Sequence, residues 1–575
     1  MNVPRSRQVS LSLLGLVALA ACRSERGPDL DSLTRLPANG ELLATQHRGP
    51  AVVAGAGGPT RFAAPLLEEF DAVHARGLLE FVDGFYRAPG NDGYEAVLER
   101  IQEDLRAAGY GRRAGFELSL IETPLTGRAW GGAERQQVPA WTPLSASLAL
   151  VRGDGTAREL LTFTRPDDAA RTMLPVYTPA ADVSGPVVFE LDEVVEGSVL
   201  VTRAAPRHSV LQRAAALGAA GVVSSYLEGY TVDPTGAGRH RDAIQFRTLE
   251  YGTPLPVMMI SPALHESIES ACLAAPDTRL ALRAEVRLDE RPLRTVVAIV
   301  RGLDRPDEAF VVASHVQEPG ANDNATGVVG LVESARSLAA LVGEGRLERP
   351  SRSLVFLWGD EFRQTQSFLD ATELTVVGGL SSDMTGASRQ ETGAICLLER
   401  MPDPAALTPL PPDEHTPWGM TEVDAESLSP NGMAVIARCA LANVGALEAG
   451  WETGEHPYEG GSDHDIFIAR GLPTALFWHF TDFTYHTSLD RLGMVDVGEI
   501  RRTAAAILST ALCVADPRPG DLDRYLRTLN QEQNLRVRAA EEAGEPLLAQ
   551  RWREWCEGAR HWLRVECLRI PPSEM

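Results

Sequence analysis

The sequence predicts an α/β protein with a mostly parallel central sheet, helices on both of its faces, a smaller α/β inserted domain and a helical C-terminal tail. From residue 290 onward, near-continuous apolar runs alternate with helical patterns, as in parallel sheets covered on both sides. A length of 575 residues exceeds what one hydrophobic core serves, so two or three domains are expected. The 44% hydrophobic and 23% charged residues are typical of a globular protein.

The charge of the chain excludes one class of partner. There are 54 Lys and Arg residues against 78 Asp and Glu residues, giving a net charge of -24. Phosphate groups would be repelled rather than neutralised by such a chain. We therefore expect no nucleic-acid partner.

Residues 1–22 are typical of a bacterial export signal. Arg5 and Arg7 precede an apolar run, 11–21, that is too short for a permanent membrane span. The end of the run, LAAC, resembles a bacterial lipobox, which implies that Cys22 is lipidated and holds the protein to a membrane. We expect an exported lipoprotein of the bacterial cell envelope, on the periplasmic or outer-membrane side. An ordinary secretory signal and an uncleaved anchor are the alternatives.

The other six cysteines do not suggest a metal site. None forms a CxxC pair, so a thiolate zinc site is not expected. Cys556 and Cys567 could form a disulfide, or their spacing could place them on one helix face. Buried thiols are the simpler interpretation.

The N-terminal half begins with a linker and continues into the main domain. Residues 23–64 are rich in Gly, Pro and Ala, which predicts a linker. Residues 65–182 are expected to form the N-terminal part of the main domain, with predicted helices over 65–86 and 93–108 and strands over 116–121, 145–151 and 159–164.

Residues 183–275 have the pattern of a compact α/β unit. Strands are expected over 186–190, 198–202 and 255–261, and a helix over 210–217. The motif LGAAGVV and the general pattern resemble the protease-associated domain of secreted exopeptidases. A plain α/β connection within one domain is the alternative.

Residues 290–515 form the core of the main domain, and 516–575 the helical tail. Strands are predicted over 295–300, 309–313, 353–358, 374–380, 394–398 and 474–478, and helices over 325–342, near 367, over 430–446 and over 497–514. In the tail, Trp552, Trp555 and Trp562 follow helical spacing, which favours packing over ligand binding.

The stretch ASHVQEPGANDNATG, residues 313–327, is the first candidate site. His315 ends a predicted strand, Asp323 lies in the Gly/Asn-rich loop that follows, and a helix begins at Ala325. Open α/β sheets bind ligands in the crevice at this edge. The pair suits a metal, although a strand-end histidine and an ordinary loop or cap residue would look the same.

Three further strand ends supply residues of the same kind. WGDE places Asp360 and Glu361 after one strand, SSDMTG places Asp383 after another, and YHTSLD carries His486. With His315 and Asp323, the set holds two His, three Asp and one Glu. Imidazole and carboxylate are ligands that zinc prefers.

The motifs GANDNATGV, GDE, SSDMTG, GSDHDIF and YHTSLD together resemble metallopeptidase family 28, which includes bacterial leucyl aminopeptidases, glutamate carboxypeptidase and glutaminyl cyclases. The resemblance covers about 290–515 and implies a zinc exopeptidase-like fold with two zinc ions per chain. It implies that Asp323 bridges the ions, that His315 and Asp383 complete one, and that Glu361 and His486 complete the other. It also implies a cis peptide bond between Asp323 and Asn324.

The family pattern assigns further roles, with two departures. Asp360 takes the place of the general base, where the family usually has Glu, and the lost methylene shortens the reach of the carboxylate by over 1 Å, a misplacement that can cost about a hundredfold in rate. Gln317 stands where the family has an Asp that orients the first imidazole. Asp490 would orient His486, and Tyr485 could donate to the oxyanion or simply pack.

These features predict an exported zinc-dependent exopeptidase, most simply an aminopeptidase acting on peptides or N-terminal aminoacyl groups through a water activated by two zinc ions. His464, His479 and Asp482 are expected near the site, and His479 and Asp482 are expected to be pocket or loop residues rather than metal ligands. Three alternatives stay open: a metal-binding but catalytically impaired peptide-binding lipoprotein, a carboxypeptidase or glutaminyl cyclase on the same scaffold, and an interaction protein without metal.

Overall fold

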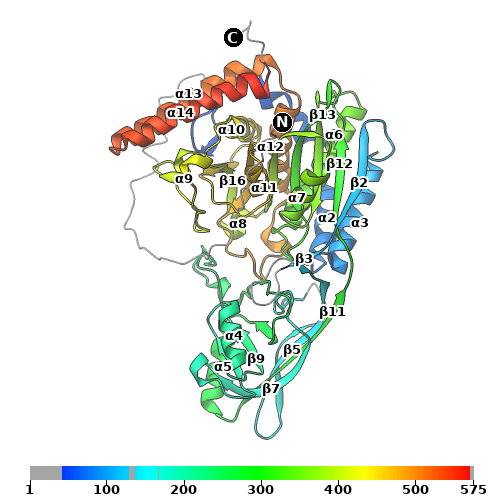
Figure 1. The fold of residues 1–575 in the computed structure, drawn as a ribbon, viewed down its shortest axis with the longest axis vertical. Helices are drawn as coiled ribbons and strands as arrows, with labels where there is room; N and C mark the ends of the chain where they lie inside the picture. Colours follow the sequence, from blue (N-terminus) through cyan, green and yellow to red (C-terminus); the bar gives the residue numbers. More distant parts are fainter. Residues whose placement is uncertain (1–41, 128–135, 166–167, 570–575) are drawn as a thin grey trace, which may run out of the picture.

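The computed structural model describes residues 42–127, 136–165 and 168–569, which form two lobes, each built on its own sheet (Figure 1). The predicted signal, with Cys22, and the first part of the predicted linker, 23–41, lie outside the described residues. The rest of the linker belongs to the larger lobe, because β1 (Gln46–Arg48) pairs with a strand of its sheet.

The larger sheet has nine strands among the described residues and is mostly parallel, as the sequence predicts. Neighbouring strands are parallel except at β16–β18, β14–β12 and β12–β2. The order is β1, β17 (Glu452–His456), β16 (Ile395–Arg400), β18 (Thr474–Phe480), β15 (Thr375–Ser382), β13 (Arg305–His315), β14 (Arg352–Gly359), β12 (Leu293–Val300) and β2 (Phe116–Thr123).

Helices cover both faces of this sheet because alternate strand residues point to opposite sides. Phe310 and Val312 join the core under one set of helices, whereas Val311 joins a second core under another set. The first set is α1 (Ala63–Glu69), α2 (Ala72–Asp83), α3 (Asp92–Ala107), α6 (Ala325–Gly343), α10 (Met433–Leu447) and α12 (Val497–Ala515), and the second is α7 (Arg363–Ala371) and α11 (His464–Ala469).

Two helices depart from simple expectation. The helix predicted over 65–86 is divided, since Asp71 caps a new helix by accepting hydrogen bonds from the amides of Val73 and His74. Helix α6 is long and apolar enough to cross a membrane, but 83% of its apolar window is buried inside the protein. It is the central core helix of the larger lobe.

Among the described residues, the smaller lobe contains a seven-stranded sheet that extends beyond the predicted range 183–275. β11 pairs with β5 along its whole length, and β5 pairs with β6, so strands expected in the larger domain belong here. The order is β10 (Val257–Met259), β9 (Gly221–Ser224), β8 (Val199–Thr202), β7 (Ala181–Val188), β11 (Arg279–Asp289), β5 (Ala140–Val151) and β6 (Ala157–Phe163), with helices α4 (His208–Ala216) and α5 (Pro262–Ala274). Further short elements include β3 (Thr126–Gly127), β4 (Gln136–Gln137), α8 (Arg389–Thr392) and α9 (Pro404–Leu407).

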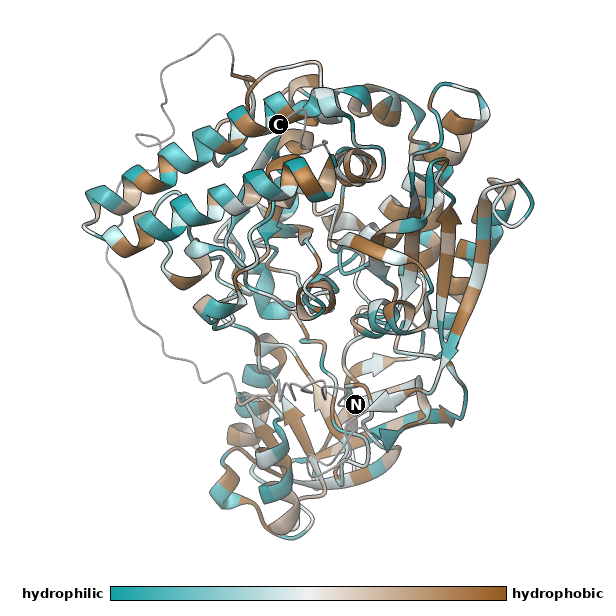
Figure 2. Cartoon of the chain, turned by 45° about the horizontal axis from the view of Figure 1, so that its top comes forward, coloured by the Kyte–Doolittle hydropathy of each residue, from teal (hydrophilic) through white to brown (hydrophobic). Residues whose placement is uncertain are grey.

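The predicted helical tail is a hairpin of α13 (Leu522–Glu542) and α14 (Pro546–Trp562), which lies across one end of the larger lobe (Figure 1). Hydrophilic residues are frequent along both of its helices (Figure 2). Trp552, Trp555 and Trp562 are buried, so the packing interpretation is confirmed. The described cysteines are all free thiols.

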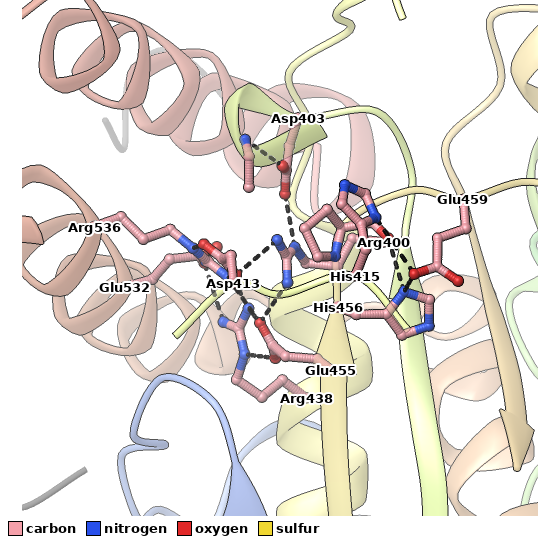
Figure 3. Close-up of polar contacts among 12 residues, drawn as sticks. Arg400, Asp403, Asp413, His415, Arg438, Glu455, His456, Glu459, Glu532 and Arg536 are labelled. Carbon is pink, nitrogen blue, oxygen red and sulfur yellow. Dashed lines mark hydrogen bonds and ion pairs between the residues drawn. The ribbon is translucent and has the colours of Figure 1, made fainter. Parts of the chain in front are cut away.

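A buried ionic network fastens this hairpin to the sheet (Figure 3). Glu455 at the end of β17 accepts hydrogen bonds from three guanidinium groups, those of Arg400 at 3.0 Å, Arg438 at 2.9 Å and Arg536 at 2.8 Å. Arg536 lies on α13, so the network joins the sheet, α10 and the tail. Asp413 and Glu532 provide further carboxylates for the same cations.

We expect Glu455→Ala to lower the free energy of unfolding by about 3–5 kcal/mol, because it leaves three buried guanidinium groups without their shared carboxylate. Urea titration followed by circular dichroism measures this. The control is Glu542→Ala on the exposed side of the same hairpin, which should change stability by no more than about 0.5 kcal/mol. Equal effects of the two substitutions would contradict a structural role for the network.

Candidate metal centre

Four parallel strands of the larger sheet bring the predicted site residues to one edge. His315 is the last residue of β13, Asp360 and Glu361 follow β14, and Asp383 follows β15. The loop after β18 carries His486. Because β18, β15, β13 and β14 run in the same direction, their carboxyl ends meet in one crevice.

The first group of possible metal ligands is His315, Glu361 and Asp383. Each offers one ligand atom, and these atoms lie within 4.8 Å of one another. The Nε2 atom of His315 is 3.0 Å from Oδ1 of Asp383 and 3.7 Å from Oδ1 of Asp323. The structure thus places Glu361 beside His315, not beside His486 as the family pattern implies.

The second group is Glu318, Asp323 and His486. Their ligand atoms also lie within 4.8 Å of one another. The Nε2 atom of His486 is 3.0 Å from Oδ2 of Asp323 and 2.7 Å from Oε2 of Glu318. Asp323 therefore lies between the two imidazoles, with one oxygen toward each.

Glu318 is a residue that the sequence analysis missed. It takes the position beside His486 that was expected for Glu361, and its backbone φ of 83° turns the chain there. The signal available in the sequence was its place between His315 and Asp323, three residues after the histidine.

The loop around Asp323 is held by several buried groups. The carboxylate of Asp490 accepts hydrogen bonds from the amides of Asn322, at 2.7 Å, and Asp323, at 2.9 Å. The expectation that Asp490 orients His486 is thus replaced by a role in holding the Asp323 loop. The Asp323–Asn324 peptide bond is cis, as the resemblance implies, and the side chain of Asn324 caps α6.

Gln317 also has a different position from the one expected. The ring atom Nδ1 of His315 faces the backbone carbonyl of Gln317, at 3.0 Å, not its side-chain amide. The amide oxygen of Gln317 instead accepts from the backbone N–H of Glu361, at 2.7 Å. Gln317 therefore orients His315 through its backbone and Glu361 through its side chain.

The two residues expected to take part in catalysis lie beside these groups. Asp360 is 5% exposed, and burial raises the pKa of its carboxyl to about 6, although Arg363 lies 3.2 Å away. The ring of Tyr485 stacks on the His486 imidazole, with centroids 3.9 Å apart. Tyr485 therefore packs against a possible ligand and also lines the cavity described below.

Three other polar residues near the site make their contacts outside the two ligand groups. His464 contacts Glu399, and His479 contacts the carbonyl of Met384 and the carboxylate of Glu499. Asp482 accepts a hydrogen bond from the side chain of Asn322. None of the three belongs to either ligand group.

The arrangement fits divalent cations. His315 Nε2, Asp323 Oδ2 and Asp383 Oδ1 are buried, and their close approaches to one another and to Nε2 of His486 lack hydrogen-bond geometry, so none has a hydrogen-bond partner in the described part of the chain. Burial and the neighbouring Glu318 raise the pKa of Asp323 well above its ordinary value, and burial does the same to the pKa of Glu361. Such crowded carboxylates can all be ionised when cations lie among them.

A cavity of about 1110 Å³ opens onto this centre from between the two lobes. Glu318, Asp360 and His486 line it on the side of the larger lobe. Aromatic and charged side chains of the smaller lobe form the opposite wall, including Tyr177, Arg207, Tyr226, Tyr230, Phe246 and Arg247. A ligand at the centre would therefore contact both lobes.

Comparisons with known proteins agree with this site. The sequence model described as Peptidase family M28 matches residues 295–391, and no curated protein matches the chain. Among solved structures, the peptidase M28 precursor of Shewanella amazonensis SB2B is 15% identical, with 79% of this chain and 96% of that chain covered and a TM-score of 0.51.

Two aminopeptidase structures are also similar. The zinc aminopeptidase of Bacillus subtilis is 15% identical, with 77% of this chain and 94% of that chain covered and a TM-score of 0.49. The aminopeptidase of Aneurinibacillus sp. strain AM-1 is 16% identical, with 79% and 96% covered and a TM-score of 0.47. Since the family match spans His315, Asp323, Asp360, Glu361 and Asp383, the resemblance seen in the motifs is confirmed, and residues 295–391 are similar to family M28 peptidases.

Proposed function

We propose that this protein is a two-zinc exopeptidase, specifically an aminopeptidase, exported and held at the cell envelope by a lipid on Cys22. The observation that carries the proposal is the pair of three-residue donor groups that meet at Asp323. The envelope location rests on the sequence alone, through the apolar run and LAAC at its end.

Each donor group would hold one zinc ion, with Asp323 shared between them. His315, Glu361 and Asp383 supply one set of nitrogen and oxygen ligands, and Glu318 and His486 complete the other. When bound, the ions supply Lewis acidity that activates a water molecule and polarises the scissile carbonyl.

The side chains of the protein would move the proton and position the substrate. Asp360 lines the cavity beside both donor groups and is placed to take a proton from the attacking water and return it to the leaving amine. Arg363, 3.2 Å from Asp360, fixes the direction of that carboxylate. Tyr485 lines the same cavity and is available to donate a hydrogen bond to the carbonyl oxygen.

The shape of the cavity favours cleavage at the end of a polypeptide. The smaller lobe closes the cavity on one side, which suits a chain end more than the middle of a polypeptide. The choice of the amino terminus over the carboxyl terminus is tested below with substrates whose amine is free or blocked.

One observation favours a second candidate, a peptide-binding protein that cleaves poorly. Asp360 stands where the family usually has Glu, and its shorter side chain is also engaged by Arg363. Metal binding does not depend on this position, so a protein of this kind would hold zinc and peptides with slow turnover.

The first test joins metal analysis to a panel of substrates. We expect about two zinc ions per chain by mass spectrometry, and hydrolysis of aminoacyl substrates with a free amine but not of N-blocked ones. Asp323→Ala should remove both the zinc and the activity, because that carboxylate serves both groups. A purified protein that takes up no zinc would contradict the proposal, and cleavage of N-blocked peptides would favour a carboxypeptidase.

The second test concerns Glu318. We expect Glu318→Gln to weaken binding of one zinc ion by about tenfold or more, because a neutral amide is a poorer zinc ligand than a carboxylate. Chelator competition measures each affinity. Glu228→Gln is the matched control, since Glu228 lines the same cavity but pairs with Arg247 and belongs to neither donor group. If the two variants bind zinc alike, Glu318 is not a ligand.

The third test concerns Asp360. We expect Asp360→Glu to raise kcat, by up to about a hundredfold, because the added methylene restores the reach of the base. Asp360→Asn should abolish turnover while zinc content stays unchanged. Absence of activity in the wild type and in Asp360→Glu, with zinc bound, would identify the protein as a binder.

A further inference from the structure

The backbone of His486 has an unusual conformation that the smaller lobe supports. Its φ is 56°, in the left-handed region that residues other than glycine rarely adopt. Its carbonyl oxygen accepts two hydrogen bonds, from the amide of Phe246 at 2.6 Å and from Nε2 of Gln245 at 2.9 Å. Both donors belong to the chain between β9 and β10 of the smaller lobe. A conformation of this kind persists only where surrounding contacts hold it.

The two chain segments run alongside each other. Gln245 and Thr487 form an antiparallel bridge. The amide of Ser488 donates to the carbonyl of Ile244 at 2.9 Å, and the amide of Ile244 donates to the hydroxyl of Ser488 at 3.1 Å. Residues 244–246, here called the bracing segment, therefore hold the metal-ligand loop by its main chain.

Aromatic contacts fix the imidazole itself. The ring of Phe246 meets the His486 ring edge-on, with centroids 5.8 Å apart and an angle of 65° between the planes. Tyr485 stacks on the same imidazole, and Tyr230 of the smaller lobe packs against Tyr485 at 5.7 Å. With these contacts, Nε2 of His486 points at Asp323 and Glu318.

The side chain of Gln245 is itself oriented. It is fully buried, and its oxygen accepts from the amide of Glu228 at 3.2 Å, which directs its Nε2 toward the carbonyl of His486. The smaller lobe thus provides a hydrogen-bond donor, Nε2 of Gln245, in a fixed position, because the oxygen of the same side-chain amide is also hydrogen-bonded.

We propose that Gln245 and Phe246 are positioning residues for His486, so that the smaller lobe completes the second metal-binding group. This inference rests on the proposed two-zinc function. It assigns the smaller lobe a role in assembling the centre as well as in walling the cavity. A lobe that merely covered the cavity would have no need to bond the main chain of a ligand.

The test measures zinc affinity in the full chain by chelator competition, without reference to turnover. Phe246→Ala and Gln245→Met should each weaken binding of the zinc ion that Glu318→Gln also affects by about tenfold or more, the range for partners that orient a ligand, and leave the other ion unchanged. Phe246→Tyr keeps the ring and should retain wild-type affinity. Phe189→Ala is the matched control, because Phe189 packs on the same core as Phe246 but contacts His265.

The outcomes separate this inference from the proposed function. Wild-type zinc affinities in both Phe246→Ala and Gln245→Met would overturn the inference, as would an equal loss in Phe189→Ala, which would indicate general loosening of the lobe. Gln245→Met keeps the length of the side chain and adds no charge to the interior. It therefore tests the inference even if Phe246→Ala folds poorly. A wild-type protein with fewer than two zinc ions would overturn the proposed function instead.

Discussion

The structure depends on placing several carboxylates together in a buried crevice. Asp323, Glu361 and Asp383 come from three different parts of the chain and meet where parallel strands end. Ionised carboxylates repel one another when water is excluded, and isolated buried charge is costly. The fold can sustain this crowding only because rigid elements hold each group and because the imidazoles and bound cations would balance the charge.

Support for Asp323 shows how the charge is kept in place. The carboxylate of Asp490 accepts hydrogen bonds from the backbone amides of Asn322 and Asp323. Arg87, which is fully buried, donates to the carbonyls of Val316 and Gly320. These contacts fix the main chain of the loop, leaving the oxygens of Asp323 for the two imidazoles. The ionic network of Glu455 with three guanidinium groups uses the same principle elsewhere, with side-chain cations in place of metal.

The sequence predicts the sheet and most ligands because both follow from local pattern. Strands such as β13 and β14 are buried on both faces, so each appears in the sequence as an apolar run whose end is easy to place. A His, Asp or Glu residue stands at that end or directly after it. By contrast, β17 reads ETGEH, with no apolar run, and could not be recognised as a strand. β11 has the alternation of a half-buried strand and was missed because it lies between the two predicted domains, 183–275 and 290–515.

Which carboxylate serves which imidazole is a property of loops, and local pattern does not determine it. Glu318, not Glu361, lies beside His486 because the φ of Glu318 is positive and because the side chain of Gln317 holds Glu361 near His315. Neither the positive φ of Glu318 nor the long-range hydrogen bond from Glu361 to Gln317 can be inferred from the sequence. The centre is therefore predictable as a set of residue types at one sheet edge, whereas its internal pairing requires the three-dimensional course of the loops, including the bracing segment contributed by the smaller lobe.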